Sequence, residues 1–321
     1  MLSETSDGKK YSSLQKLVGQ ALTPQSVAKS IPDLQELSEK LINQMLESKE
    51  NIEINKVTHR LALDVTMRQI IGLNLKTKEE IDEFHKSVQT WMTVMSNVFL
   101  YILPLPQKIL KMTKEYKAKK VIDSLIEERI NYLRENGPDS STLSGMVFAT
   151  DDEAEEGQRN KLTQKQIIDN VYVLIIAGSD TSSLTLTNAM LLLGMNPDVW
   201  KQVVAEQEDL IAKHGPNLTK EQLDNDCPYL TAVIKETMRL LPISGGLFRD
   251  IKETVIMDDM QIPKGWLAIC SPSLTHELDP ITYKKDRSHM DVKTGFKPER
   301  WLSEETRPTE FMSFGTSGYT F

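Results

Sequence analysis

The residues best suited to chemistry in this sequence form a polar group inside an apolar run. Residues 163–194 read TQKQIIDNVYVLIIAGSDTSSLTLTNAMLLLG, and the stretch AGSDTS places a glycine, an acid and hydroxyl side chains in its middle. Gly costs a helix about 1 kcal/mol against Ala, and Ser and Thr compete for backbone carbonyls. If the helix opens locally, Asp180 and Thr181 face a cavity and can relay protons. A helix bend at a domain contact explains the same residues equally well.

A second candidate group is the pair Glu236 and Arg239 within residues 228–241, PYLTAVIKETMRLL. Three residues apart, the two side chains share one helix face. On a surface such a pair contributes only a few tenths of a kcal/mol. The flanking residues are apolar, which favours partial burial, and a buried pair needs a third hydrogen-bonding partner. These flanking residues are Ala232, Val233, Met238 and Leu240.

The chain has two cysteines, Cys227 and Cys270, and no CxxC pair. Two cysteines form no disulfide framework, and the spacing does not indicate zinc, so the sequence fits a reducing compartment. We expect each cysteine to serve as a small buried hydrophobe.

Composition limits the remaining possibilities. A chain of 321 residues with 39% hydrophobic content can bury a large core, as one domain or two. The net charge of −8 gives no electrostatic reason to expect nucleic-acid binding. The sequence has no apolar stretch of ~18 residues, and residues 1–11 are polar, so we expect a soluble chain without signal peptide or anchor.

Helices are predicted through most of the first 150 residues. Thr23-Pro24 begins a helix that Pro32 interrupts, and residues 55–72 and 76–95 form two amphipathic helices. A long charged helix is predicted for residues 108–136, and the acidic residues 151–159 form a solvated loop.

The central helix is delimited by a capping box, Thr163 with Gln166, and by Asn196-Pro197. Beyond it, helices are predicted from Pro197 to about residue 214, after the Thr219–Gln222 capping box, and over residues 228–241. Four short strands follow, which is typical of an α+β layout. Their predicted ranges are 246–250, 253–257, 260–263 and 266–271.

The motifs AGSDTS, KETMR, FKPERW and FMSFG occur in this order, and the chain thereby resembles the haem-thiolate monooxygenases of the cytochrome P450 family. The stretches LPISGGLFRD, IPKGW and THELDP are similar to the branch that acts on retinoids, sterols and triterpenoids. The resemblance implies a mainly α (α+β) cytochrome P450 fold with a long central helix and a small β-sheet region, incomplete at both ends. It also implies one domain over residues 1–321, with a helical part (1–150), an oxygen-activating helix (163–194) and a Glu-Arg helix, short strands and the start of the haem loop (228–321).

The resemblance also implies roles for individual residues. Asp180 and Thr181 correspond to the acid–alcohol pair that delivers protons to iron-bound dioxygen, and Ala177 and Gly178 leave the backbone room beside the haem face. The family's Glu-Arg-Arg core, which braces the haem loop, falls on Glu236, Arg239 and Arg300.

The resemblance also implies which residues bind the cofactor. Arg249 and Lys16 correspond to partners of the haem propionates, and Phe314 and Gly315 begin the haem loop. The family's axial cysteine position is occupied by Phe321, which offers iron no donor, so no metal ligand is assigned. The match stops abruptly after Gly315, which we interpret as a truncated or mis-spliced gene record.

By resemblance, the function is insertion of one oxygen atom from O2 into a large apolar sterol, terpenoid or retinoid. Haem is the implied cofactor, with NADPH-derived electrons arriving through a reductase or ferredoxin. Membrane association is expected only through a missing N-terminal segment, which would place a full-length parent at the endoplasmic reticulum. The alternative is a non-catalytic, haem-free helical remnant that binds lipid or a protein partner.

Overall fold

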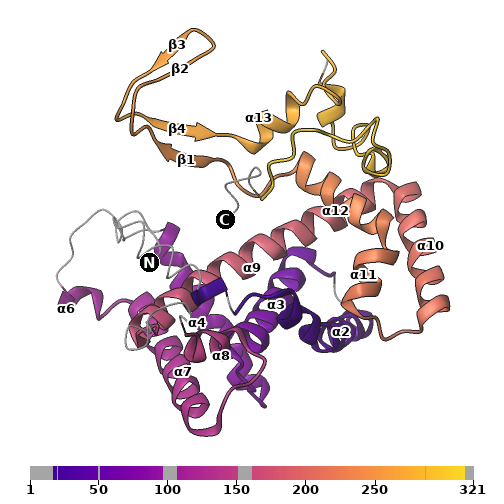
Figure 1. Cartoon of the computed structure of the whole chain (residues 1–321). Helices are drawn as coiled ribbons and strands as arrows, with labels where there is room; N and C mark the ends of the chain where they lie inside the picture. The colour runs from indigo at the N-terminus through magenta and orange to yellow at the C-terminus, as the bar shows by residue number, and fades with distance from the viewer. Residues whose placement is uncertain are drawn as a thin grey trace. The chain divides into compact units, whose positions relative to one another are not determined.

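Helices make up most of the chain in the computed structural model, which describes residues 17–19, 21–49, 51–96, 107–150, 161–285 and 287–314 (Figure 1). The chain divides into two compact units, Met1–Ser183 and Leu184–Phe321. The boundary falls inside α9 (Gln164–Met195), the longest helix described. This confirms the mainly α fold with a long central helix; the single-domain organisation stays a prediction.

The first long helix of the first unit is α2 (Pro24–Glu47). Thr23 caps this helix, as predicted, because its hydroxyl oxygen accepts a hydrogen bond from the Ser26 amide. The predicted interruption at Pro32 is wrong, because α2 continues through this residue. An internal proline removes one ladder hydrogen bond and costs roughly 3 kcal/mol. The packing of α2 against the next helix, α3 (Ile54–Val65), provides the tertiary contacts that can offset this cost.

The predicted helix over residues 55–72 is present, but its last turn is wider than an α-helix. After α3 the chain continues as a π-helix, η2 (Thr66–Ile71), and ends at Gly72 with a left-handed φ of 77°. A Cβ at Gly72 would also lie 2.8 Å from the Ser141 Cβ, so both backbone and space require glycine here.

In the described part of the chain, four more helices lie between η2 and α9: α4 (Lys78–Ser96), α6 (Gln107–Leu110), α7 (Lys114–Asn136) and α8 (Thr142–Phe148). The helix predicted over residues 108–136 is divided, because Thr113 stops α6 and caps α7 by accepting from the Tyr116 amide. Helix α8 was not predicted. The acidic segment 151–159 lies outside the described residues.

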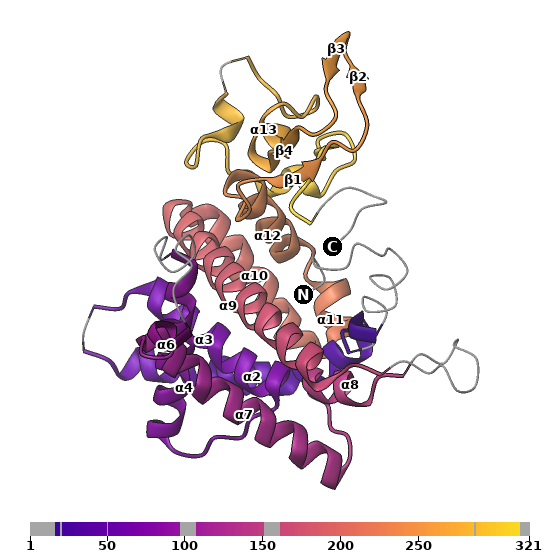
Figure 2. The same cartoon turned by 90° about the vertical axis from the view of Figure 1, so that its left-hand side faces the viewer.

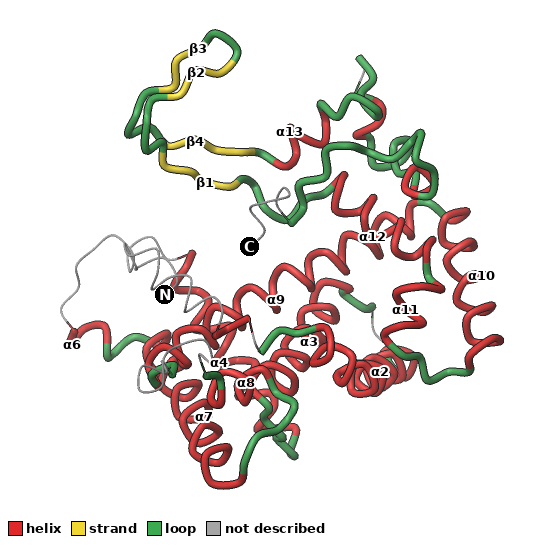
Figure 3. Tube along the Cα trace, in the orientation of Figure 1, coloured by secondary structure: helices red, strands yellow, loops and turns green. Residues whose placement is uncertain are grey.

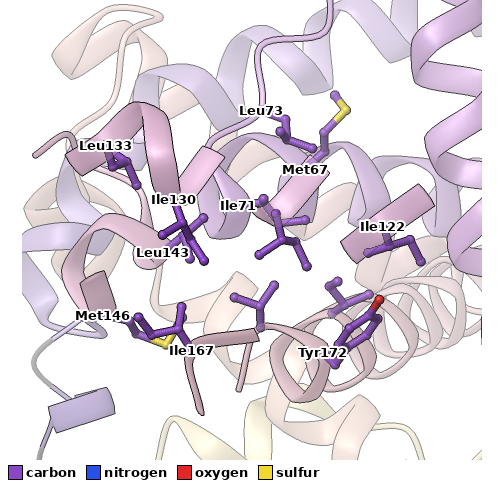
Figure 4. Close-up of a cluster of buried hydrophobic side chains, with 14 of the residues drawn as sticks. Met67, Ile71, Leu73, Ile122, Ile130, Leu133, Leu143, Met146, Ile167 and Tyr172 are labelled. Carbon is purple, nitrogen blue, oxygen red and sulfur yellow. The ribbon is translucent and has the colours of Figure 1, made fainter. Parts of the chain in front are cut away.

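The core of the first unit forms where α4, α7, α8, η2 and the first half of α9 meet. Helices α4 and α7 pack side by side (Figures 1 and 2). Burying each large aliphatic side chain is worth about 1.5–3 kcal/mol, so this cluster stabilises the first half of α9 in its unit. Its members include Met67, Ile71, Leu73, Ile122, Ile130, Leu133, Leu143, Met146, Ile167 and Tyr172 (Figure 4).

The second unit contains α10 (Pro197–His214), α11 (Lys220–Asp226) and α12 (Pro228–Leu240), as predicted, including the Thr219–Gln222 capping box. Four short strands follow: β1 (Leu247–Asp250), β2 (Val255–Met257), β3 (Met260–Ile262) and β4 (Leu267–Cys270). Strands β1 and β4 pair antiparallel, as do β2 and β3 (Figure 3).

The second unit ends with α13 (Pro272–Glu277) and two 3₁₀ turns, η3 (Ser288–Met290) and η4 (Pro298–Trp301). Among the residues described, no helix is both long enough and apolar enough to cross a membrane.

Candidate functional site

The carboxylate of Glu236 organises the best-defined polar cluster of the second unit. Both Arg239 and Glu236 are completely buried on α12. The Arg239 guanidinium binds Glu236 with two hydrogen bonds, Nε to Oε2 and Nη2 to Oε1, each 2.9 Å. Arg300 on η4 adds its Nε at 2.8 Å from Oε1. The contact predicted from the sequence, one Glu with two Arg, is therefore present.

Two further donors to Glu236 were not predicted. The Trp301 indole Nε1 donates to Oε2 at 2.9 Å, and the Lys297 amide donates to Oε1 at 3.1 Å. Both residues belong to the FKPERW motif, but the sequence does not reveal that the segment folds back onto α12. Five donors to one carboxylate satisfy a buried charge that would otherwise be very costly.

Backbone carbonyls complete the cluster on the side of the guanidinium groups. Arg239 Nη2 donates to the His289 carbonyl at 2.7 Å, and Arg300 Nη2 donates to the Gly295 carbonyl at 3.1 Å. A Cβ at Gly295 would lie 2.6 Å from the Asp291 carbonyl oxygen and 2.7 Å from that of His289. Only glycine therefore lets the loop after η3 close tightly enough to present its carbonyl to both arginines.

The hydroxyl residues of α9 find their partners within the helix itself. Ser179 donates to the Ile175 carbonyl at 2.5 Å, Ser183 donates to the Asp180 carbonyl at 3.0 Å, and Thr181 donates to the Ala177 carbonyl. Such bonds to carbonyls about one turn earlier give these hydroxyl groups partners within the helix. The predicted local opening near Ala177–Thr181 is accordingly not present: α9 is α-helical throughout residues 164–195.

The π-helical turn of the first unit lies at η2, next to α9. A Cβ at Gly178 would come within 3.3 Å of the Ile70 Cδ1 in η2, so the missing side chain permits this close packing. Ala177 and Thr181 are exposed on another face of α9. The roles of Ala177 and Gly178 beside a haem, and the cavity expected at Thr181, stay predictions.

Asp180 has a partner that the sequence did not indicate. Its Oδ1 lies 3.3 Å from His59 Nε2 on α3, a residue 121 positions earlier. The Asp180 side chain is 53% exposed and that of His59 26% exposed, so solvent reaches both side chains. His59 lies in an ordinary amphipathic helix, and its sequence context gives no signal for this contact.

The other candidate residues are not brought together in the described structure. Arg249 is exposed on β1, with Nη1 donating to the Phe248 carbonyl at 2.9 Å, and Phe314 is exposed at the end of the described chain. Lys16, Gly315 and Phe321 lie outside the described residues. Their cofactor roles stay predictions.

The two cysteines differ in environment. Cys227 is buried as expected, and burial raises the pKa of its thiol, opposed by a hydrogen bond from Gln207. Cys270 is exposed on β4, so the expectation of a buried hydrophobe is wrong there. A strand of a two-stranded ribbon has no second layer to cover both of its faces, which explains the exposure.

The assignment of the axial iron position to Phe321 stays a prediction, because this residue lies outside the described part of the chain. Phenylalanine at position 321 has no donor atom, and the Cys227 thiol is buried with its proton stabilised. Within the described ranges, no group of three or more His, Cys, Asp or Glu side chains could hold a metal ion.

The fold and the Glu236 cluster define the class of protein, and comparison with known proteins agrees. The cytochrome P450 family model matches residues 4–316, so the chain belongs to the cytochrome P450 family. Members of this family are haem-dependent oxidoreductases of the monooxygenase type.

Among individual relatives, the putative cytochrome P450 120 of Synechocystis is 26% identical over 94% of this chain and 62% of its own length. Cytochrome P450 26A1 of Gallus gallus is 25% identical over 94% of this chain and 60% of its own length. Cytochrome P450 85A1 of Oryza sativa is 29% identical over 82% of this chain and 53% of its own length. The chain thus spans about three fifths of these relatives.

Solved structures show the same fold. The retinoic acid-bound cyanobacterial CYP120A1 superimposes with a TM-score of 0.73 at 26% identity, covering 96% of this chain and 66% of that chain. The haem domain of cytochrome P450DA superimposes with a TM-score of 0.79 at 19% identity, covering 98% of this chain and 67% of that chain, and this likeness concerns the fold alone.

Proposed function

We propose that this chain carries the acid–alcohol pair and the Glu-Arg-Arg core of a haem-dependent monooxygenase for large apolar substrates. The observation that carries the proposal is the Glu236 carboxylate, which binds Arg239 and Arg300 together while buried. Such a cluster fixes residues 296–301 against α12. In the family, this core braces the loop that holds the haem. Electrons would come from NADPH through a reductase or ferredoxin.

The substrate class is inferred from the relatives. One solved relative is described as bound to retinoic acid, and a Taxus cuspidata relative, 24% identical over 79% of this chain, is a taxoid 7-beta-hydroxylase. Both compounds are large and mostly apolar. A retinoid, sterol or terpenoid is therefore the class we propose for this chain.

In this proposal Asp180 and Thr181 handle protons. The Thr181 hydroxyl donates to the Ala177 carbonyl, and a hydroxyl group can accept a hydrogen bond as well as donate one. Asp180 lies beside His59 and can exchange protons with solvent. The pair thus combines a proton acceptor at the helix surface with a hydroxyl one residue away.

A second candidate function is a haem-free polypeptide that binds lipid. It is favoured by the phenylalanine at position 321 and by large apolar side chains exposed on the strands, such as Phe248, Ile256 and Ile269. Exposed apolar patches commonly mark lipid or protein contacts.

A chimera separates the two candidates. Residues 164–314 of this chain would replace the matching segment of the Synechocystis relative, which supplies the axial cysteine and the rest of the fold. We expect the ferrous carbon monoxide complex to show the thiolate band, and retinoic acid, a sterol or a diterpene to be oxidised. D180N or T181A should lower turnover by roughly 10²-fold, whereas T181S should retain most of it.

The thiolate band serves as the folding control in this experiment. A chimera that shows the band but oxidises none of the three substrate classes would contradict the monooxygenase proposal and favour the lipid-binding alternative. Equal turnover of the chimera and its D180N and T181A variants would contradict the roles given to these residues.

A further inference from the structure

A buried carboxylate after α13 gathers the segment that precedes the expected haem loop. Asp279 is fully buried, and its Oδ2 accepts from the Thr309 amide at 2.7 Å, the Thr309 hydroxyl at 2.9 Å and the Glu310 amide at 2.7 Å. Its Oδ1 accepts from the amides of Ile281 and Thr282 at 3.1 and 2.9 Å. One side chain therefore joins residues 281–282 to residues 309–310.

A buried imidazole holds the next residues of the same segment. His276 on α13 is fully buried; its Nε2 accepts from the Met312 amide at 2.9 Å, and its Nδ1 lies 3.0 Å from the Arg239 carbonyl. Because the partner of Nε2 is an N–H donor, this nitrogen must be unprotonated, and Nδ1–H donates to the carbonyl. The Met312 bond therefore requires a neutral imidazole.

Aromatic contacts connect this imidazole to the Glu236 cluster. The His276 ring stacks on Phe311 with centroids 5.5 Å apart and planes at 17°, and Phe311 meets the Trp301 ring edge-on at 4.9 Å. Trp301 in turn donates to Glu236. Residues 309–312 are thus connected to α13 through His276 and to α12 through Trp301.

We propose that His276 and Asp279 form a clamp that positions residues 309–312, and that the His276 half of this clamp opens when its imidazole is protonated. The clamp sets the position of Phe314, the first residue of the expected haem loop. The inference rests on the proposed function only for the identity of that loop. The clamp itself needs neither haem nor substrate.

The direction of the pH effect follows from the environment of the ring. Burial lowers the pKa of His276, and the charge of Arg239 lowers it further. The hydrogen bond to the Arg239 carbonyl and the charges of Asp279 and Glu236 raise it, but they do not outweigh burial. The pKa of His276 is therefore lower in the folded protein than the value of about 6.5 expected in the unfolded chain. As the pH falls, His276 is protonated in the unfolded chain before it is protonated in the folded protein. The clamp is therefore fully formed above about pH 6.5 and weakens as the pH falls below that value.

Asp279 responds in a lower pH range. Burial alone would raise its pKa, but hydrogen bonds from Glu310, Thr282 and Thr309 outweigh burial and lower the pKa below the usual value. Its contribution is present above the unfolded pKa of about 3.9 and is lost as pH falls through the lower native value. Above about pH 4, therefore, the Asp279 half stays formed and acidification weakens only the His276 half.

Hydrogen exchange of the peptide covering residues 309–314, measured on the full chain, tests the clamp. We expect its protection, corrected for the intrinsic rate, to fall severalfold, at most about eightfold, between about pH 7 and about pH 5.5, because the unfolded pKa of about 6.5 sets the limit. H276Q keeps one donor and one acceptor but does not titrate, so it should retain protection at both pH values. H276L should lose protection at both, and H214Q, on α10, should behave as the wild type.

Two results would overturn the inference. H276Q showing the same loss on acidification as the wild type would exclude titration of His276, and H276L retaining full protection would exclude a positioning role. The wild-type pH profile needs no substitution, so failure of a variant to fold does not leave the clamp untested. Since the measurement uses no haem, it can succeed even if the monooxygenase proposal fails.

Discussion

At the scale of single residues, Glu236 is the side chain on which the second unit depends most. Its ExxR spacing and apolar neighbours predicted a buried ion pair, and FKPERW supplied Arg300 through resemblance. The remaining partners, Trp301 Nε1 and the Lys297 amide, could not be predicted because they depend on how the segment after η3 folds back. The same holds for His59, which only tertiary packing brings to Asp180.

The first prediction concerns Glu236. E236A removes the only carboxylate facing Arg239 and Arg300 among the bonds described, which leaves two guanidinium groups without their acceptor. We expect a loss of about 3–5 kcal/mol in the free energy of unfolding, measured by urea denaturation. E208A, at an exposed position of α10, is the control and should change the value by less than about 0.5 kcal/mol. Equal losses in the two variants would contradict the role given to Glu236.

At the scale of elements, caps and prolines were the most reliable signals. Capping boxes at Thr163 and Thr219 and the prolines at 24, 197 and 228 mark helix starts that the structure confirms. Errors arose where tertiary packing outweighs local propensity. Helix α2 runs through Pro32, and the wide turn lies in η2 instead of α9, whose hydroxyl side chains bond to carbonyls of their own helix.

A glycine substitution tests the loop that joins these elements. In G295A the new Cβ would lie within 2.6–2.7 Å of backbone atoms of Asp291 and His289, so the loop must move away from Arg239 and Arg300. We expect a loss of about 1–3 kcal/mol in thermal or urea unfolding.

The matched control is G245A, where no atom lies within 4 Å of the added Cβ. This change should be neutral or should stabilise by about 0.4–1 kcal/mol through the unfolded state. A G295A protein as stable as G245A would show that the loop does not need its close approach.

At the scale of the whole molecule, the resemblance gave the family and the α+β layout, which the comparisons and the described structure confirm. Division into two compact units within α9 could not be read from the sequence, since the helix signal is continuous there. The sequence likewise did not predict which side chains of the strands are exposed to solvent. Short alternating strands do not reveal which faces remain uncovered.

The exposed strand residues lead to a prediction about association. Ile256 on β2 and Met260 on β3 are 76% and 67% exposed, and a two-stranded ribbon leaves both its edges unpaired. The double variant I256K/M260K should reduce light scattering on heating while leaving the unfolding midpoint nearly unchanged. I42K/L46K, which adds the same charge at exposed positions on α2, should not reduce scattering. Equal effects of the two variants would show that net charge, not these strands, controls association.

The most direct test of the account is the carbon monoxide difference spectrum of this polypeptide supplied with haem and reduced. The family elements are present, but position 321 is phenylalanine, Cys227 is buried and Cys270 lies on an exposed strand. We therefore predict weak haem binding without the thiolate band, because thiolate donation needs a sulfur at the axial position. A strong thiolate band would contradict this account, and its loss in C270S or C227S would identify the sulfur that binds iron.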